Sequence, residues 1–530
     1  MSYKILNGNE LLIQGALEAG FNLYTGYPGS PLADFFNILH EQRLELQKKG
    51  IRVVIANSEA NAAAMASGAK MAGQNVLVAM KSMGLHVASD ALSVGNFANP
   101  GGDIKSGVVV AVGDDPWSIS TSTPADSRYL FKHLHMPFLE PSSPQELKDW
   151  MAKALTLSTE SSVYIGILLT TFMAEGGGRV TIGSEKEINN TPITLDPSTF
   201  NLSSNVMVPP NSLIADRDMV LNRFPKVKSA LKDLALDEIS GHESADIGIV
   251  SGGGVFETLK QVLEESGLIN EFSLYKAATS YPFNDSQLLP FLKNKKTIVV
   301  VEEKRGFLES ELRGFIGKHN LKIEVFGKEF GDNEGFPSFG GLSYEIIYRK
   351  LNLLQDFLSF TPGDANCQLP VKLDVPLPKR LPTFCPGCPH RETLSIMKDV
   401  RASLADKNVN LISHGDVGCY SLAFLEPFKE MHDLSAMGQG GSLGAGTDLF
   451  TTNPSVVLMG DSTFFQSGMT SISNSVQMGH NITYILLDND NTAMTGHQVT
   501  PRTGTSVDGE ARPRQNMLEV VKSLRADSSI

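Results

Sequence analysis

Short apolar runs alternate with amphipathic stretches along the first 175 residues of the chain. The stretch "NGNELLIQGALEAG" (7–20) repeats apolar residues at helical spacing, and Asn7 or Asn9 is placed to cap that helix. Strands are predicted by apolar, mostly β-branched runs at 21–31, 52–57, 75–80 and 106–114. Because strands alternate with helices, this region predicts a parallel sheet with crossover helices.

The same alternation returns twice further along the chain. Strand, turn and helix follow one another at 245–267 and again at 296–320. A third set of strands is predicted at 410–418, 455–461 and 482–490. Two stretches lack the pattern: 176–240 holds Gly, Asn, Ser and Pro clusters before a charged helix, and 356–383 is rich in proline.

A chain of 530 residues is too long for one hydrophobic core. The predicted fold class is α/β, with three doubly wound, mostly parallel-sheet domains. The domains are predicted at 1–175, 241–355 and 384–530, joined by linkers at 176–240 and 356–383.

Composition and charge narrow the class of protein. Hydrophobic residues make up 41% and charged residues 19%, which is ordinary for a globular chain. A net charge of −13 repels phosphate backbones, so it argues against nucleic-acid binding and suits a basic protein partner. The start of the chain lacks the pattern of a signal peptide, and no apolar run has membrane-spanning length. We therefore expect a cytoplasmic protein without membrane segments.

Polar residues follow two of the strands predicted in the third domain. Gly460, Asp461 and Ser462 end one strand, and Asn489 and Asn491 end the next. In open α/β sheets ligands bind at this edge, and carboxylate and amide oxygens suit a hard cation such as Mg²⁺. Gly460 allows a close approach of backbone to a diphosphate. The alternative is that Asp461 only caps a helix.

This spacing is similar to the thiamine diphosphate motif, Gly-Asp-Gly followed by an Asn some two dozen residues later, with Ser462 as a departure at the third position. The whole chain resembles the 2-oxoacid:ferredoxin oxidoreductases, in particular the alpha subunits of their indolepyruvate branch. The resemblance rests on "YTGYPGSP", "SEANAAAMASGAKMAG", "MKSMGLHVASDAL", "GDDPWSISTSTPADSRY", "FLEPSSPQELKD", "CPGCPHR", "GDVGCYSL", "GDSTFFQSGM" and "DNDNTAMTGHQ". It implies a pyrimidine-binding, a transketolase-C-like and a diphosphate-binding domain, in that order.

The resemblance implies a role for each motif. Glu59 would hold a ring nitrogen of the aminopyrimidine and activate thiamine, although Ser58 and Glu59 are equally suited to cap a small-residue helix. Asp461 and Asn489 would bind Mg²⁺ through their side chains and Asn491 through its carbonyl. The further cofactor- and substrate-contacting positions it implies are Pro28, Gly29, Ser30, His86, the Gly438–Gly446 turn, Thr495 and Gly496.

The stretch "FCPGCPHRE" (384–392) allows several interpretations: a zinc knuckle, a redox pair, an iron–sulfur ligand set or a tight turn. The resemblance favours a loop beside the cofactor, formed by Cys385, Gly387, Cys388 and His390. In relatives with a cluster, such a pair and a later cysteine, here Cys419, hold a [4Fe–4S] centre. Three cysteines leave one iron without a ligand, and Cys367 in the linker is the only other cysteine. The chain also lacks the cysteine-rich tail of its relatives, so we expect a truncated or unusual subunit.

The reaction that the resemblance implies is oxidative decarboxylation of an aryl, indolepyruvate-like 2-oxo acid to an acyl-CoA. The implied partners are the 2-oxo acid, coenzyme A, a ferredoxin-type electron acceptor and a beta/gamma-type subunit in an oligomer. Two alternatives are a non-oxidative thiamine-dependent decarboxylase and a catalytically silent assembly subunit.

Overall fold

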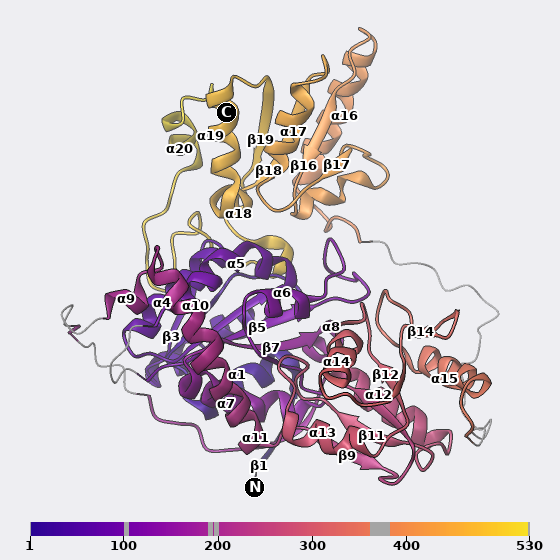
Figure 1. The fold of residues 1–530 in the computed structure, drawn as a ribbon. Helices are drawn as coiled ribbons and strands as arrows, with labels where there is room; N and C mark the ends of the chain where they lie inside the picture. The colour runs from indigo at the N-terminus through magenta and orange to yellow at the C-terminus, as the bar shows by residue number, and fades with distance from the viewer. Residues whose placement is uncertain (1, 100–104, 189–193, 196–200, 361–381, 528–530) are drawn as a thin grey trace. The chain divides into compact units, whose positions relative to one another are not determined.

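The computed structural model of the chain describes residues 2–99, 105–188, 194–195, 201–360 and 382–527 (Figure 1). The chain forms two compact units, Met1–Lys372 and Leu373–Ile530. Each unit contains mostly parallel sheets with helices between the strands, which confirms the predicted α/β fold class. None of the helices in the described ranges is long and apolar enough to cross a membrane.

The first unit begins with a six-stranded, wholly parallel sheet, in the order β3-β2-β4-β5-β7-β6. Its strands are β2 (Leu23–Gly26), β3 (Arg52–Ile55), β4 (Val76–Lys81), β5 (Val108–Asp114), β6 (Phe138–Leu139) and β7 (Ile165–Thr170). Its helices are α1 (Gly8–Ala19), α2 (Ala33–Glu41), α3 (Arg43–Lys48), α4 (Glu59–Met71), α5 (Ser82–Phe97), α6 (Ser127–His133), α7 (Pro144–Ser161) and α8 (Thr171–Glu175). The four strands predicted from the sequence here correspond to β2–β5.

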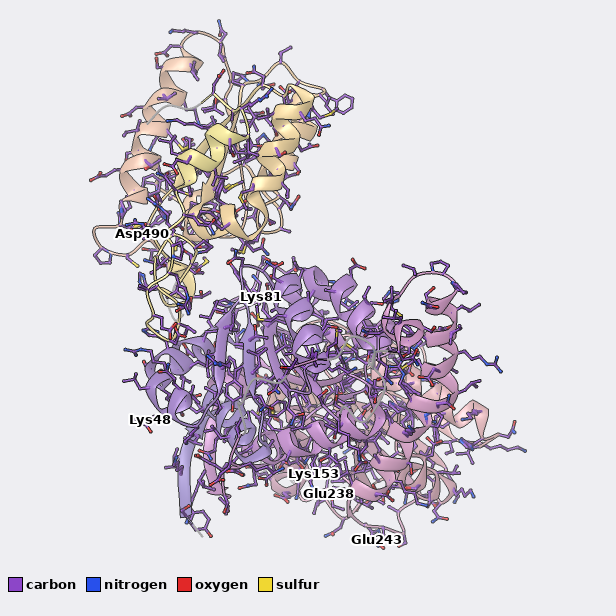
Figure 2. The ribbon with its side chains drawn as sticks, turned by 90° about the vertical axis from the view of Figure 1, so that its left-hand side faces the viewer. Lys48, Lys81, Lys153, Glu238, Glu243 and Asp490 are labelled. Carbon is purple, nitrogen blue, oxygen red and sulfur yellow. The ribbon has the colours of Figure 1, made fainter. Side chains whose placement is uncertain are left out.

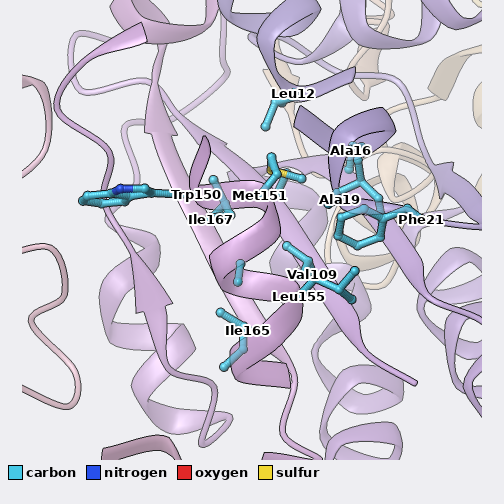
Figure 3. Packing of buried hydrophobic residues seen from close by; sticks show 14 of the residues in the cluster. Leu12, Ala16, Ala19, Phe21, Val109, Trp150, Met151, Leu155, Ile165 and Ile167 are labelled. Atoms are coloured by element: carbon cyan, nitrogen blue, oxygen red, sulfur yellow. The ribbon is translucent and has the colours of Figure 1, made fainter. Parts of the chain in front are cut away.

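Successive residues of each strand pack alternately into two separate hydrophobic cores, one on each face of the sheet. In β4, Val76, Val78 and Met80 face the core that contains α4 and α5. Leu77 and Ala79 face the opposite core, where α1 and α7 pack (Figure 3). Since both faces of the sheet are covered, its strands are apolar throughout and the sheet is doubly wound.

Helix α1 begins where the sequence predicts. Asn7 caps it by accepting the N–H of Glu10, and the Glu10 carboxylate accepts the N–H of Asn7, so the two residues form a capping box. Gly15 lets α1 approach α7 closely, because a Cβ there would lie 2.3 Å from the carbonyl oxygen of Lys148.

The residues that follow β7 form a further two-stranded sheet and several helices. Strand β8 (Gly177–Ile182) pairs antiparallel with the N-terminal strand β1 (Ser2–Asn7). The described part of 201–240 holds α9 (Leu202–Asn205), α10 (Asn211–Asp218), the π-helix η2 (Met219–Arg223) and α11 (Phe224–Leu234). Helix α11 is the charged helix that the sequence predicts.

A five-stranded sheet in the order β13-β12-β10-β11-β9 completes the first unit. It is parallel except for β9, and its strands are β9 (Glu238–Gly241), β10 (Ile247–Ser251), β11 (Ser273–Lys276), β12 (Thr297–Val301) and β13 (Glu324–Phe326). Helices α12 (Gly254–Glu265) and α15 (Tyr344–Leu353) cover one face, and α13 (Asp285–Lys293) and α14 (Phe307–Lys318) cover the other. The 3-10 turn η3 (Leu354–Asp356) and a small ribbon, β14 (Glu329–Phe330) with β15 (Asn333–Glu334), close this part.

The second unit holds a four-stranded parallel sheet in the order β17-β16-β18-β19. Its strands are β16 (Ile412–Gly415), β17 (Asp433–Leu434), β18 (Ser455–Gly460) and β19 (Ile482–Leu487). Its helical segments are α16 (His390–Ala405), η4 (Cys419–Phe424), α17 (Gly440–Asp448), α18 (Asp461–Thr463), η5 (Phe464–Gly468), α19 (Met469–Met478), η6 (Ala493–Thr495) and α20 (Met517–Ser523). Cys367 and most of the predicted linker at 356–383 lie outside the described residues.

Candidate functional site

Asp461 follows the central strand β18 directly and is 1% exposed. One carboxylate oxygen, Oδ1, accepts the N–H of Ser462 at 2.7 Å. The other, Oδ2, is buried and has no hydrogen-bond partner among the described residues. Burial raises the pKa of this carboxyl group to about 6, and the backbone N–H groups of Ser462, Asn489 and Asp490 act against that shift. A buried carboxylate oxygen without a partner is costly unless something else binds it, so Asp461 has a free ligand position.

Asn489 and Asn491 follow the neighbouring strand β19, whose last residue pairs with Gly460. The side-chain oxygen of Asn489 accepts the N–H of Asn491 at 3.3 Å, and the Asn491 amide donates to the Asn489 carbonyl at 2.9 Å. The Ser462 hydroxyl donates to the Asn491 carbonyl at 3.4 Å. These contacts bring Ser462, Asn489 and Asn491 to one edge of the sheet, beside Asp461.

The donor set fits a hard cation. It combines a carboxylate, an amide oxygen and a backbone carbonyl, the oxygen ligands that Mg²⁺ takes together with phosphate oxygens and water. The unpartnered Oδ2 of Asp461 is the observation that tests the fit, since a structural cap would have both oxygens satisfied.

A glycine-rich turn precedes α17 beside this edge. Gly438 has φ +78°, and a Cβ there would lie 2.1 Å from the Ser467 hydroxyl oxygen. Gly440 packs on the backbone of Gly415, with 2.9 Å from a built Cβ to the Gly415 carbonyl carbon. The turn therefore brings bare backbone and the first N–H groups of α17 to the edge where a diphosphate could bind.

The loop after β19, which carries Asp490 (Figure 2), folds back on itself. Thr495 donates its hydroxyl to the Gln498 side-chain oxygen at 2.5 Å, and Thr492 donates its N–H to the Gln498 carbonyl. Gly496 takes φ +116°, which a side chain would strain. The roles predicted for Thr495 and Gly496 remain predictions.

Glu59 is the first residue of α4 and is 1% exposed. Ser58 caps the helix by accepting the N–H of Asn61 at 3.3 Å, so the capping role belongs to Ser58. Gly84 makes room for the Glu59 side chain, because a Cβ at Gly84 would lie 2.6 Å from its Cγ. A buried carboxylate at a strand–helix junction of a parallel sheet has the chemistry to hold a ring nitrogen.

Lys81, which is labelled in Figure 2, is the last residue of β4 and interacts electrostatically with Glu59. Burial lowers the pKa of its ammonium group, and the Glu59 carboxylate acts against that shift. Its stem packs on Gly29, where a Cβ would lie 2.6 Å from Lys81 Cδ. Lys81 thus connects the loop after β2 to Glu59.

The residues predicted to line a substrate pocket lie in different environments. Pro28 and Gly29 are buried in the loop after β2, and Ser30 is half-buried. His86 is exposed on α5. Their roles remain predictions.

The "CPGC" stretch forms a tight turn that leads into α16. Gly387 has φ +73°, and Cys388 donates its N–H to the Cys385 carbonyl at 3.1 Å. Burial raises the pKa of the Cys419 thiol, and the thiols of Cys388 and Cys385 raise it further. Over the described residues, however, no group of three or more His, Cys, Asp or Glu is arranged to hold a metal ion.

His390 is the first residue of α16 and is buried. Its ring lies against Phe384 and Tyr420, at centroid distances of 6.4 and 6.5 Å. Burial lowers the pKa of His390, which favours the neutral ring.

Sequence reasoning missed three residues of these sites: Lys81, Asp416 and Tyr420. Asp416 directly follows β16, as Asp461 follows β18, so the strand-end rule that selected Asp461 could also have selected Asp416. Lys81 also stands at a strand end, but its proximity to Glu59 depends on the fold and has no sequence signal.

Three family models match the chain in order. The thiamine diphosphate-binding domain of pyruvate flavodoxin/ferredoxin oxidoreductases matches 14–198, the indolepyruvate oxidoreductase domain matches 237–356, and the C-terminal thiamine pyrophosphate-binding domain matches 416–530.

Relatives cover nearly the whole chain. The protein from Methanothermobacter marburgensis named indolepyruvate oxidoreductase subunit IorA is 30% identical over 507 residues, which span 95% of this chain and 77% of that protein. The proteins of the same name from Methanothermobacter thermautotrophicus and Thermococcus kodakarensis are 29% and 27% identical, over 98% and 99% of this chain and 80% of each relative. A solved 2-oxoglutarate:ferredoxin oxidoreductase from Magnetococcus marinus, with 2-oxoglutarate, coenzyme A and succinyl-CoA bound, shares the fold at a TM-score of 0.50 and 18% identity, over 66% of this chain and 64% of that one.

Proposed function

Because this chain belongs to the indolepyruvate oxidoreductase IorA family of 2-oxoacid:ferredoxin oxidoreductases, we propose that it converts an aryl, indolepyruvate-like 2-oxo acid to its acyl-CoA. Thiamine diphosphate-dependent oxidative decarboxylation of a 2-oxo acid is the reaction of the family. The aryl side chain of the substrate, coenzyme A as acyl acceptor and a ferredoxin-type electron acceptor are the proposed refinements.

The observation that carries the proposal is the unpartnered, buried oxygen of Asp461 at the carboxyl end of β18. Asp461 and Asn489 would hold Mg²⁺ by their side chains, and Asn491 by its carbonyl. The N–H groups that follow Gly440 in the first turn of α17 would donate hydrogen bonds to the diphosphate oxygens. We thereby assign Asp461 to the binding of Mg²⁺ and the start of α17 to the binding of the diphosphate.

In the first unit, Glu59 would hold the aminopyrimidine by accepting a hydrogen bond from a ring nitrogen. Bound thiamine diphosphate supplies the carbon nucleophile that attacks the keto carbon of the substrate. The task of Glu59 is to hold and release one proton at that ring nitrogen. Burial excludes water from the Glu59 carboxylate, so its hydrogen bond is stronger than it would be in solvent.

We assign Pro28, Gly29, Ser30 and His86 of the first unit to substrate binding, and Thr495 and Gly496 of the second unit to cofactor binding. Support for the first set comes from the loop after β2, which reaches Lys81 and through it Glu59.

The three cysteines do not complete a [4Fe–4S] site by themselves. Such a cluster has four irons, and Cys385, Cys388 and Cys419 would supply at most three thiolates. We therefore expect substoichiometric iron or none in the isolated chain purified anaerobically, and a full cluster only when another ligand is supplied. Iron and acid-labile sulfide assays check this; a stoichiometric [4Fe–4S] spectrum of the isolated chain would contradict it.

The test of the function has two stages. Calorimetry of the cofactor-free chain should show thiamine diphosphate binding that requires Mg²⁺. The chain with a beta/gamma-type subunit should then release carbon dioxide and form acyl-CoA from indolepyruvate faster than from pyruvate or 2-oxoglutarate, with reduction of a low-potential dye. Carbon dioxide release that needs no electron acceptor would indicate a non-oxidative decarboxylase, and absence of cofactor binding a silent assembly subunit.

A further inference from the structure

Asp416 is a fully buried carboxylate in the second unit, outside the proposed ligand set. It directly follows β16 and is 0% exposed. Its Oδ2 accepts the N–H of Gly438 at 3.2 Å, and the N–H of Gly440 also donates to this carboxyl group. Asp416 therefore binds both ends of the turn that starts α17.

Tyr420 connects Asp416 to the other half of the site. The Tyr420 hydroxyl donates to Asp416 Oδ1 and lies 3.3 Å from the hydroxyl oxygen of Thr463, two residues after Asp461. Two glycines shape the space for the ring: a Cβ would lie 2.3 Å from Tyr420 Cε1 at Gly418 and 3.1 Å at Gly460. The ring is thus held between the ends of β16 and β18.

The recorded partners of Asp416 are neutral dipoles, namely a phenol and two backbone N–H groups. Burial raises the pKa of this carboxyl group to about 7, and these three donors act against the shift. An ionised carboxylate that is buried without a cation destabilises the folded state. The position of Asp416 therefore indicates that it contributes to another property of the site.

We propose that Asp416, held by Tyr420, is a positioning residue that fixes the Gly438–Gly440 turn relative to Asp461 and thereby sets the affinity for magnesium diphosphate. Its two oxygens bind opposite sides of the site: Oδ2 takes the turn of α17, and Oδ1 reaches the end of β18 through Tyr420. This inference rests on the proposed cofactor site. It identifies the residues that fix the turn before α17 relative to the end of β18. Groups one shell outside a metal site typically change metal affinity about 10- to 100-fold when they are removed.

The test is Asp416→Asn in the full chain. The amide keeps the size of the side chain but cannot accept hydrogen bonds on both sides, so the turn loses one of its anchors. We expect thiamine diphosphate to bind about 10- to 100-fold more weakly by calorimetry, and the Mg²⁺ concentration for half-saturation to rise. Inorganic pyrophosphate with Mg²⁺, as a second probe, should lose affinity in parallel, because the effect lies at the diphosphate.

Asp433→Asn is the matched control. Asp433 is the first residue of β17, at the edge of the same sheet, and its half-exposed carboxylate binds the His414 ring at 2.9 Å and not the turn. The Asp433→Asn variant should bind both probes within about twofold of the wild-type affinity. Substitutions away from a site usually change free energies by no more than a few tenths of a kcal/mol.

Wild-type affinity for both probes in Asp416→Asn, with or without a lower melting temperature, would overturn the inference. If Asp416→Asn does not fold, Tyr420→Phe carries the test: it removes one hydroxyl and should weaken both probes several-fold. Wild-type affinity in Tyr420→Phe would overturn the inference as well. Failure of the wild-type chain to bind thiamine diphosphate would instead remove the proposed function itself.

Discussion

Asp461 is the residue on which the cofactor assignment depends. Its unpartnered oxygen is buried, so replacing it with Asn removes the charge that would compensate the cation without changing the volume. We expect Asp461→Asn to weaken magnesium-dependent thiamine diphosphate binding by about 100-fold or more, the order of losing a charged, buried interaction. Calorimetry with and without a chelator measures this. Asp399→Asn on the exposed face of α16 is the control and should bind with wild-type affinity; equal affinities in wild type and Asp461→Asn would contradict the metal assignment.

Glu59 is the residue on which the proposed activation of thiamine depends. Glu59→Gln keeps the volume but holds the ring nitrogen in the wrong protonation pattern. We expect cofactor affinity to persist while turnover falls about 100-fold or more, as for other lost acid–base groups. The rate of proton exchange at the thiazolium C2 of bound cofactor, followed by NMR, checks the cause. Glu41→Gln at the exposed end of α2 should leave that rate unchanged, and a near-normal rate in Glu59→Gln would exclude the role.

At the scale of elements, the start of α5 fits around the start of α4. Gly84→Ala would place a methyl group 2.6 Å from Glu59 Cγ, so the carboxylate must move. We expect loss of activity and slower C2 proton exchange. Gly68→Ala on α4 is the matched control, because nothing lies within 4 Å of its built Cβ, and a helix gains about 0.5–1 kcal/mol from this change. Similar activities in the two variants would contradict the close fit of α5 on Glu59.

The connection between α11 and β9 is held by a half-buried acid, Asp237. The Asp237 carboxylate accepts the Tyr275 hydroxyl of β11 and, at 2.8 Å, the N–H of Ala278. Burial raises its pKa to about 6. Because the folded state then holds the proton more tightly than the unfolded state, this group stabilises the fold below about pH 4 and loses that contribution as the pH rises through about 6.

Asp237→Asn cannot titrate, so it should remove this pH dependence. We expect the free energy of unfolding of the variant, relative to wild type, to rise by on the order of 2 kcal/mol between pH 4 and pH 8. Urea unfolding at the two pH values measures the difference. A difference that does not change with pH would show that Asp237 titrates normally.

At the scale of the molecule, the two sheets of the first unit share a buried ionic network. Arg128 of α6 donates to Glu302 at 2.7 Å and to Asp126 at 2.6 Å, and all three side chains are at most 4% exposed. Lys304 binds Asp114 nearby at 2.5 Å. The network connects the end of the first sheet to the residues that follow β12, so the two sheets are held as one unit.

Removal of Arg128 leaves the buried Glu302 carboxylate without this ion-pair partner, and Asp126 keeps Lys304 at 3.7 Å. We expect Arg128→Met to lower the free energy of unfolding of the first unit by about 3–5 kcal/mol. Both tryptophans, Trp117 and Trp150, belong to this unit, so tryptophan fluorescence in urea reports on it. Lys132→Met is the control from the same helix: its pair with Glu311 is 46% and 21% exposed and should contribute less than about 1 kcal/mol. Equal losses of unfolding free energy in Arg128→Met and Lys132→Met would show that burial does not make the Arg128 ion pairs more important for stability.

The sequence alone determined the α/β class, the strands β2–β5, a cap at Asn7 or Asn9, of which the structure shows Asn7, and the strand-end positions of Asp461, Asn489 and Asn491, because periodicity, capping and turn chemistry are local. It also placed Glu59 at a strand–helix junction. Only the tertiary structure decided that Lys81 stands beside Glu59, that Oδ2 of Asp461 lacks a partner among the described residues, and that Asp416 holds the turn of α17. Those facts depend on which residues from distant segments meet at the sheet edges, and packing across the chain, which leaves no local pattern, sets them.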